Sequence, residues 1–341
     1  MTDRKIKTSE KKLLEYIENK SQKPTTLYVD LAIKTVRIIC YQDEFIPHLK
    51  KQLTYTLSEG APKYDATIVI WQEDNILGLY EDESLYYENN DLSKGITYIT
   101  FSYTKSAITL YAPENEIYFY GVKYNEPEEF THIFSKIFSM ILKTEKTNLV
   151  HGACAGLNNQ GILMCARSGG GKSTLSILSL LEGFEYVSDD LLTLEKEGEN
   201  LYAYPIYSVI TLSPKMYNEM YDKLEGARFV SNHSAQKNKY VLNIKNLHGQ
   251  FRKKYPIKFG LFLEFTKEEN PSLTKCTQAE KGNAITRLVH STVFQMMDRE
   301  DTQEIKKLIG MLNGLKFYKI SLCNNIYKNV ECLRKIYEGE K

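Results

Sequence analysis

The chain has 341 residues, a length for which two domains is the usual arrangement. Its 44 Lys and Arg residues balance 43 Asp and Glu residues, so the net charge of +1 gives no global field that would attract nucleic acid or an anionic membrane. No apolar run approaches the roughly 18 residues that a bilayer-spanning helix needs, and no apolar signal region follows the charged N-terminus.

The six cysteines are scattered, and none forms a Cys-x-x-Cys pair (Cys40, Cys154, Cys165, Cys276, Cys323 and Cys332). This spacing argues against a disulfide framework and against a zinc site, and it fits a reducing cytoplasm. We therefore expect a cytoplasmic protein with neither a nucleic-acid nor a membrane partner. Whether it forms a homo-oligomer stays open.

Apolar and polar patterns divide the first part of the chain into several short elements. They predict a frayed helix (1–22), β structure with a turn (27–40), a helix (46–58), a strand (66–71), a polar loop (88–91) and an antiparallel meander (96–122).

The clearest helix of the first part of the chain is predicted at residues 127–143. Seven apolar residues repeat there with the period of one helix face (Phe130, Ile133, Phe134, Ile137, Phe138, Ile141 and Leu142). We place a domain boundary just after it. Residues 1–145 are then expected to form an α+β domain that could bind a substrate or partner, and residues 146–341 a second domain.

The second domain reads as alternating strands and helices, the pattern of an α/β fold. Strands are predicted at 161–165, 184–188, 201–212, 257–265 and 317–322, helices at 173–181, 213–224, 278–297 and 302–314, and a polar loop at 231–239.

Residues 166–173, Ala-Arg-Ser-Gly-Gly-Gly-Lys-Ser, match a phosphate-binding P-loop between a predicted strand and a predicted helix. The glycines can adopt φ > 0, which lets backbone N–H groups turn toward an anion at the positive end of the helix. Lys172 supplies a mobile cation and Ser173 a Mg2+ ligand. The alternative is a glycine-rich turn that binds no phosphate, but a chance match to the motif rarely has both a strand before it and a helix after it. The residues assigned to the nucleotide are Ser168, Gly169, Gly170, Gly171, Lys172, Ser173 and Thr174.

The next predicted strand ends in two adjacent carboxylates, Asp189 and Asp190. Beside a P-loop, one carboxylate can support Mg2+ and the other can act as general base toward a hydroxyl. An Asp-Asp turn at a strand end is the alternative, and the neighbouring P-loop makes the functional interpretation the better one. His151, in Asn148-Leu-Val-His-Gly152, would by itself more often be a structural histidine.

The spacing of these motifs resembles that of HPr kinase/phosphorylase, in the phosphoenolpyruvate-carboxykinase-like class of P-loop enzymes. His151 precedes Lys172 by 21 positions, and Asp189 and Asp190 follow it by 17 and 18. The resemblance covers about residues 148–195. It implies a P-loop domain with a mixed sheet that uses ATP and Mg2+ to phosphorylate a Ser or Thr hydroxyl.

The resemblance also implies catalytic roles for individual residues. Asp190 would accept the proton, Asp189 would support the metal together with Ser173, and Lys172 would bind the phosphates. The two Asp roles could be exchanged. His151 would lie near the transferred phosphate and orient the acidic pair.

The chain departs from the family pattern in two places. Ala166 replaces the first glycine of the loop, which is a tolerated change. Residues 203–214 stand where bifunctional members carry a Gly-rich segment for phosphorolysis, and this departure argues against phosphorylase activity and against HPr as the substrate. The chain is therefore more similar to HPr-kinase-related proteins encoded near modified-peptide genes, which implies a peptide or small-protein acceptor rather than HPr.

Two other functions remain as alternatives: a kinase for a small hydroxyl metabolite such as free serine, and a nucleotide-binding module without turnover. The Asp pair argues against the module, since a pure binder needs no base. Five basic residues could reach phosphates or a peptide, although each alone reads better as a solvated charge (Lys237, Lys239, Arg252, Lys253 and Lys254).

Overall fold

The structure is a computed structural model that describes residues 18–19, 23–54, 56–60, 63–72, 87–91, 96–101, 107–112, 117–122, 130–142, 144–167, 169–224, 228–232, 237–247, 249–296 and 302–338. The chain forms two compact units, one mainly up to Ile137 and the other mainly from Phe138. The division falls inside helix α3 (Phe130–Ile141). The boundary at 145/146 stays a prediction, and the predicted helix at 1–22 lies outside the described residues except for 18–19.

The first unit is built on a seven-stranded mixed sheet in the order β1-β2-β3-β7-β6-β5-β4. Its elements are β1 (Thr25–Asp30), β2 (Thr35–Cys40), η1 (Asp43–Phe45), α2 (Ile46–Gln52), β3 (Ala66–Gln72), β4 (Tyr87–Asp91), β5 (Ile96–Phe101), β6 (Ala107–Ala112) and β7 (Ile117–Val122). The predicted meander is present, because β4 to β7 pair antiparallel in sequence order. The loop predicted at 88–91 is wrong: these residues form β4, and their ladder with β5 overrides the turn preference of Asn and Asp.

The second unit contains a ten-stranded mixed sheet in the order β17-β11-β9-β10-β18-β13-β12-β8, with β20 also beside β18 and β19 beside β20. Its strands are β8 (Thr147–His151), β9 (Ala153–Leu157), β10 (Gln160–Cys165), β11 (Glu185–Ser188), β12 (Leu191–Glu197), β13 (Asn200–Pro205), β17 (Gln250–Phe251), β18 (Tyr255–Phe265), β19 (Ser272–Lys275) and β20 (Lys316–Leu322). The central strand β10 pairs antiparallel with β9 and parallel with β18, which also pairs parallel with β20.

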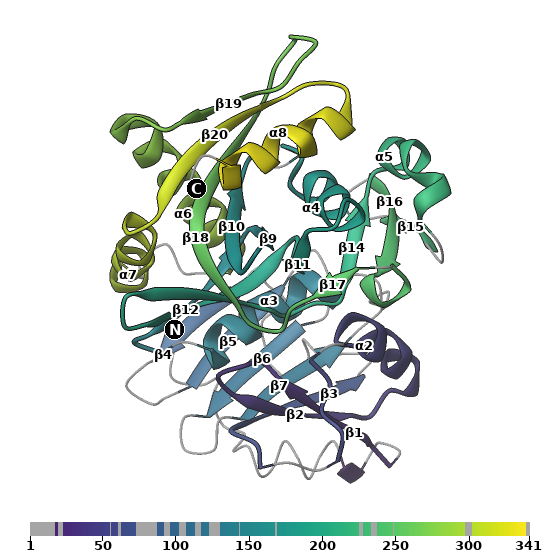
Figure 1. Ribbon diagram of the computed structural model, residues 1–341. Coiled ribbons are helices and arrows are strands. Elements are labelled where there is room, and N and C mark those ends of the chain that lie inside the picture. The colour runs from purple at the N-terminus through teal and green to yellow at the C-terminus, as the bar shows by residue number, and fades with distance from the viewer. Residues whose placement is uncertain are drawn as a thin grey trace. The chain divides into compact units, whose positions relative to one another are not determined.

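Helices cover both faces of this sheet (Figure 1). They are α4 (Lys172–Leu181), α6 (Gln278–Met296), α7 (Thr302–Asn313) and α8 (Ile326–Glu338). Because side chains alternate along a strand, Ile162 and Met164 of β10 pack with α4 and α8, whereas Leu163 and Cys165 pack with α6 and α7. The sheet is therefore buried on both sides, and its strand ends are where a ligand can approach.

A smaller three-stranded sheet, β14-β16-β15, belongs to the same unit. Its strands are β14 (Val209–Leu212), β15 (Arg228–Asn232) and β16 (Lys237–Asn243), accompanied by α5 (Pro214–Glu219), η4 (Tyr221–Lys223) and η5 (Ile244–Asn246). The predicted helix at 213–224 is thus a short helix followed by a 3-10 turn. The predicted loop at 231–239 is wrong at both ends, where β15 and β16 lie, and its middle (233–236) lies outside the described residues.

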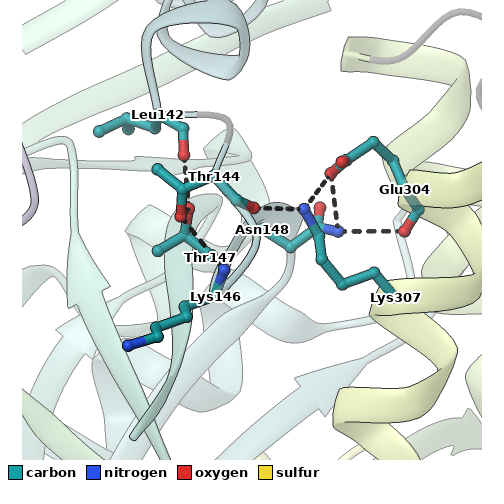
Figure 2. Close-up of polar contacts among 7 residues, drawn as sticks. All are labelled: Leu142, Thr144, Lys146, Thr147, Asn148, Glu304 and Lys307. Carbon is teal, nitrogen blue, oxygen red and sulfur yellow. Dashed lines mark hydrogen bonds and ion pairs between the residues drawn. The ribbon is translucent and has the colours of Figure 1, made fainter.

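A buried asparagine fixes the start of β8 (Figure 2). Asn148 Nδ2 donates to the backbone oxygen of Glu304 in α7 at 3.1 Å and to Glu304 Oε2 at 3.5 Å. Lys307 lies 2.5 Å from the same Oε2 and donates to the backbone oxygen of Thr144 at 2.7 Å. These bonds tie the segment that precedes His151 to α7.

We expect Asn148→Ala to lower the free energy of unfolding by about 1–3 kcal/mol, because it removes a buried donor from the Glu304 carboxylate and carbonyl. Urea unfolding followed by circular dichroism measures the change. Asn313→Ala, at an exposed position of α7, is the matched control. Equal midpoints for the two variants would contradict the anchoring role of Asn148.

The described helices include none that is both long and apolar enough to span a bilayer. All six cysteines are free thiols, as the spacing predicts.

Candidate active site

The glycine loop connects the end of β10 to the start of α4, as predicted. Gly169 and Gly171 have φ of 72° and 92°, the left-handed region that favours glycine. At Gly171 a Cβ would also lie 2.9 Å from Leu322 Cδ1, so a side chain there would require the Leu322 side chain to shift. Gly170 N donates to Arg167 O at 2.8 Å, so this amide closes a turn within the loop. Ser168 lies outside the described residues.

Lys172 is the first residue of α4, and its side chain is buried. Burial lowers the pKa of the ammonium group below its ordinary value, while the carboxylates of Asp190 and Asp189 act in the opposite direction. The Lys172 ammonium group therefore interacts with two carboxylates at the start of a helix. The N-terminal end of a helix carries a partial positive charge, which favours a bound anion such as phosphate.

Asp189 is buried, with 3% of its surface exposed. Burial and the neighbouring charge of Asp190 raise its pKa from 3.8 to about 7, although hydrogen bonding to Ser173, the charge of Lys172 and hydrogen bonding to Tyr186 act to lower it. Among the described residues, Asp189 Oδ2 has no hydrogen-bond partner. A buried carboxylate oxygen without a partner is unfavourable in the protein alone and has a vacant coordination position for a cation.

This arrangement fits Mg2+ only together with phosphate. Ser173 and Asp189 provide two neighbouring oxygen ligands, and the free Oδ2 is one of them. The described residues include no group of three acidic, His or Cys side chains that could hold a metal without help. Mg2+ commonly uses one or two protein oxygens and takes its remaining ligands from phosphate and water.

Asp190 faces His151, and the two side chains interact. His151 Nδ1 lies 3.3 Å from Asp190 Oδ1, and Gly152 N donates to Asp190 O at 2.9 Å. Strand pairing causes this proximity, because Leu191 of β12 lies opposite His151 of β8. The His151 backbone is also held by Thr292 Oγ1 in α6, which accepts from His151 N at 3.1 Å. The structure thus brings together the two predicted pairs, His-Gly and Asp-Asp.

A cavity of about 460 Å³ lies beside the loop. Its lining includes all of the described nucleotide-assigned residues, 169–174. Its other walls include residues of β14, α5, the ends of β18 and β20, and the start of α8, which the motif spacing did not predict. Neither Asp189 nor Asp190 nor His151 lines it. The site therefore has two sides, a cavity beside the loop and an acidic side beyond Lys172.

The five basic residues named as further candidates differ in their position relative to the cavity. Lys239 is half-buried in the cavity lining and forms no ion pair with a described residue, whereas the side chain of Lys237 lies outside the described residues. Arg252 pairs with Glu185 and Lys254 with Glu197, away from the cavity. Lys253 is exposed.

The raised pKa of Asp189 makes stability depend on pH. Between its ordinary value of 3.8 and about 7, the folded protein binds this proton more strongly than the unfolded chain does, so the contribution of Asp189 to stability falls as pH rises through that window. The Tm of Asp189→Asn, measured by calorimetry without Mg2+ or nucleotide, should therefore fall less than that of the wild type between about pH 5 and pH 8. Parallel curves for the two proteins would contradict this assignment.

No protein-family model matches the chain, and no curated protein does. Among solved structures, the chain is similar to the HPr(Ser) kinase/phosphatase from Coxiella burnetii, with 12% sequence identity and a TM-score of 0.30. The match covers 57% of this chain and 98% of that chain. This is a distant similarity. The mixed α/β architecture with its large mixed sheet is observed directly, while the family remains a prediction.

Proposed function

We propose that the protein is a Mg2+-dependent kinase that transfers the γ-phosphate of ATP to a Ser or Thr hydroxyl of a peptide or small protein. The observation that carries this proposal is the placement of Lys172 between a glycine loop and an acidic pair whose members differ in environment. Asp189 is buried with a free oxygen, and Asp190 is 42% exposed and faces His151. A site for phosphate binding alone would need no such pair.

On the donor side, the loop and Lys172 neutralise phosphate charge. The α4 N-terminus adds its dipole to that of the ammonium group. Ser173 and Asp189 would hold Mg2+, which supplies charge neutralisation when bound. The free Oδ2 of Asp189 supports this role, since coordination would give the buried oxygen the partner that it lacks.

On the acceptor side, Asp190 would take the proton of the attacking hydroxyl as the hydroxyl oxygen receives the phosphoryl group. His151 orients the Asp190 carboxylate through the 3.3 Å contact, and its own position is fixed by β8 and by Thr292. General-base help of this kind contributes about 10²–10⁴-fold to a rate.

The exposure of Asp190 supports a large acceptor. Its carboxylate lies at the surface and outside the cavity lining, so the acceptor hydroxyl approaches from solvent. A Ser or Thr side chain on a flexible peptide can reach such a position, whereas a small metabolite would gain little binding energy from so open a site.

The test is incubation of the protein with ATP, Mg2+ and two acceptor sets: Ser- and Thr-containing peptides, each with its Ala counterpart, and free serine. Mass spectrometry should detect phosphate on the hydroxyl peptides only. Phosphoserine formed from the free amino acid would favour the metabolite kinase. Tight ATP binding with no product in either set would favour the nucleotide-binding module and contradict the proposal.

A further inference from the structure

We propose that the cavity beside the loop is an adenine pocket in which Phe265 stacks on the base and Asn324 bonds its polar edge. This inference rests on the proposed function, because the phosphates must lie on the loop for the base to reach the cavity. Neither residue belongs to the phosphate-binding motif or to the acidic pair.

The position of the cavity follows from the parallel strands. β10, β18 and β20 are neighbours and run parallel, so their carboxyl ends meet at one edge of the sheet. The glycine loop follows β10, Phe265 ends β18 and Leu322 ends β20. A ligand whose phosphates occupy the loop therefore has the ends of the two neighbouring strands beside it.

Phe265 is 64% exposed, the most exposed of the large hydrophobic side chains among the described residues. Its ring nevertheless lies at the loop, because a Cβ built on Gly171 would be 3.5 Å from Phe265 Cζ. The ring therefore presents apolar surface to the cavity rather than to the core. An exposed aromatic ring beside a phosphate site provides a stacking surface for a base.

The rest of the cavity lining is both apolar and polar, and its polar side chains include Thr211, Ser213, Lys215 and Lys239. It includes aliphatic side chains from α4, β14, α5, β20 and α8 (Leu175, Leu178, Leu212, Met216, Leu322 and Ile326). The volume of about 460 Å³ lies within the range of small-molecule and cofactor sites.

Three asparagines follow β20, and two of them are already engaged. Asn325 Oδ1 accepts from Tyr327 N at 3.2 Å and from Lys328 N at 3.3 Å, which caps α8. Asn329 accepts from Cys323 N at 2.9 Å and donates to Cys323 O at 3.0 Å, which fixes the segment that carries Asn324. Asn324 lines the cavity and makes no hydrogen bond to a described residue.

The free amide of Asn324 favours adenine over guanine. An asparagine amide presents one acceptor and one donor side by side. These match the amino donor and N7 acceptor at the N6–N7 edge of adenine, whereas the O6–N7 edge of guanine offers two acceptors, so the preference applies to a base that is bound through this edge.

The experiment compares binding of Mg-ATP, Mg-GTP and magnesium tripolyphosphate, which lacks a base, by isothermal titration. Phe265→Ala should weaken ATP binding about 5- to 100-fold, the usual effect of losing one base stack, and leave tripolyphosphate binding unchanged. Phe265→Trp should retain ATP binding. Asn324→Ala should reduce the preference for ATP over GTP. Tyr221→Ala, at a ring that is 62% exposed and outside the cavity, is the matched control.

The outcomes separate this inference from the proposed function. If the wild type binds both ATP and tripolyphosphate and Phe265→Ala binds ATP equally well, the base pocket is disproved and the phosphate site stands. If the wild type binds neither ligand, the proposed function fails. Equal loss of both ligands in Phe265→Ala would show that the ring supports the loop rather than the base, and would also overturn the inference.

Discussion

Asp190→Asn is expected to lower kcat for phosphate transfer by about 10²–10⁴-fold, the usual contribution of a general base. The amide keeps the size of the side chain but cannot accept the proton of the hydroxyl. Binding of Mg-ATP should be retained, because Asp190 lies outside the cavity lining and Asp189 is the carboxylate proposed to hold the metal. Steady-state kinetics with the best peptide acceptor and titration with Mg-ATP measure the two quantities.

Asp222→Asn, at an exposed position of η4, is the matched control and should keep the wild-type kcat. If Asp190→Asn transferred phosphate at the full rate, Asp190 would not be the base. If Asp189→Asn instead lost kcat and kept its Mg2+ dependence, the two roles would be exchanged.

Lys172→Met is expected to abolish turnover and to weaken Mg-ATP binding at least about tenfold, because a buried charged donor to the phosphates is lost. The protein without ligand should remain as stable as the wild type or become more stable. Burial of the ammonium group lowers its pKa, because desolvation of the charged form reduces the stability of the folded protein. Met fills a similar volume without a charge and removes this unfavourable contribution. Thermal unfolding with and without Mg-ATP measures both effects.

Lys253→Met provides the control, since Lys253 is exposed and lies outside the cavity lining. It should bind Mg-ATP nearly as well as the wild type. A large fall in Tm for Lys172→Met with an unchanged ATP-induced shift would make Lys172 a structural residue.

Local patterns predicted much of the second unit. The strand, glycine loop and helix from β10 to α4 follow from an apolar run, three glycines and a second apolar run, all within about twenty residues. The apolar stripe within residues 127–143 predicted α3, and helices were also predicted where α6 and α7 lie. The helix α8 was missed although its signal is present: Ile326, Val330, Leu333 and Tyr337 recur at the spacing of one helix face.

Non-local pairing explains most of what sequence could not predict at the site. Period-2 alternation places Tyr186 and Asp189 on opposite faces of a strand, but the register of β11 shifts between Tyr186 and Ser188, and the two side chains interact. The contact between His151 and Asp190 depends on pairing of β8 with β12, and the cavity gathers strand ends that are far apart in the chain. The neighbouring P-loop indicated a functional role for the acidic pair, whereas the role of His151 was implied only by the resemblance to HPr kinase.

A crystal structure with Mg2+ and a non-hydrolysable ATP analogue tests the central claim most directly. The expected result is a triphosphate along residues 169–174, a metal ion bound by Ser173 Oγ and Asp189 Oδ2, and Asp190 facing the γ-phosphate. An analogue bound elsewhere, or a metal ion that contacts neither Ser173 nor Asp189, would contradict the account.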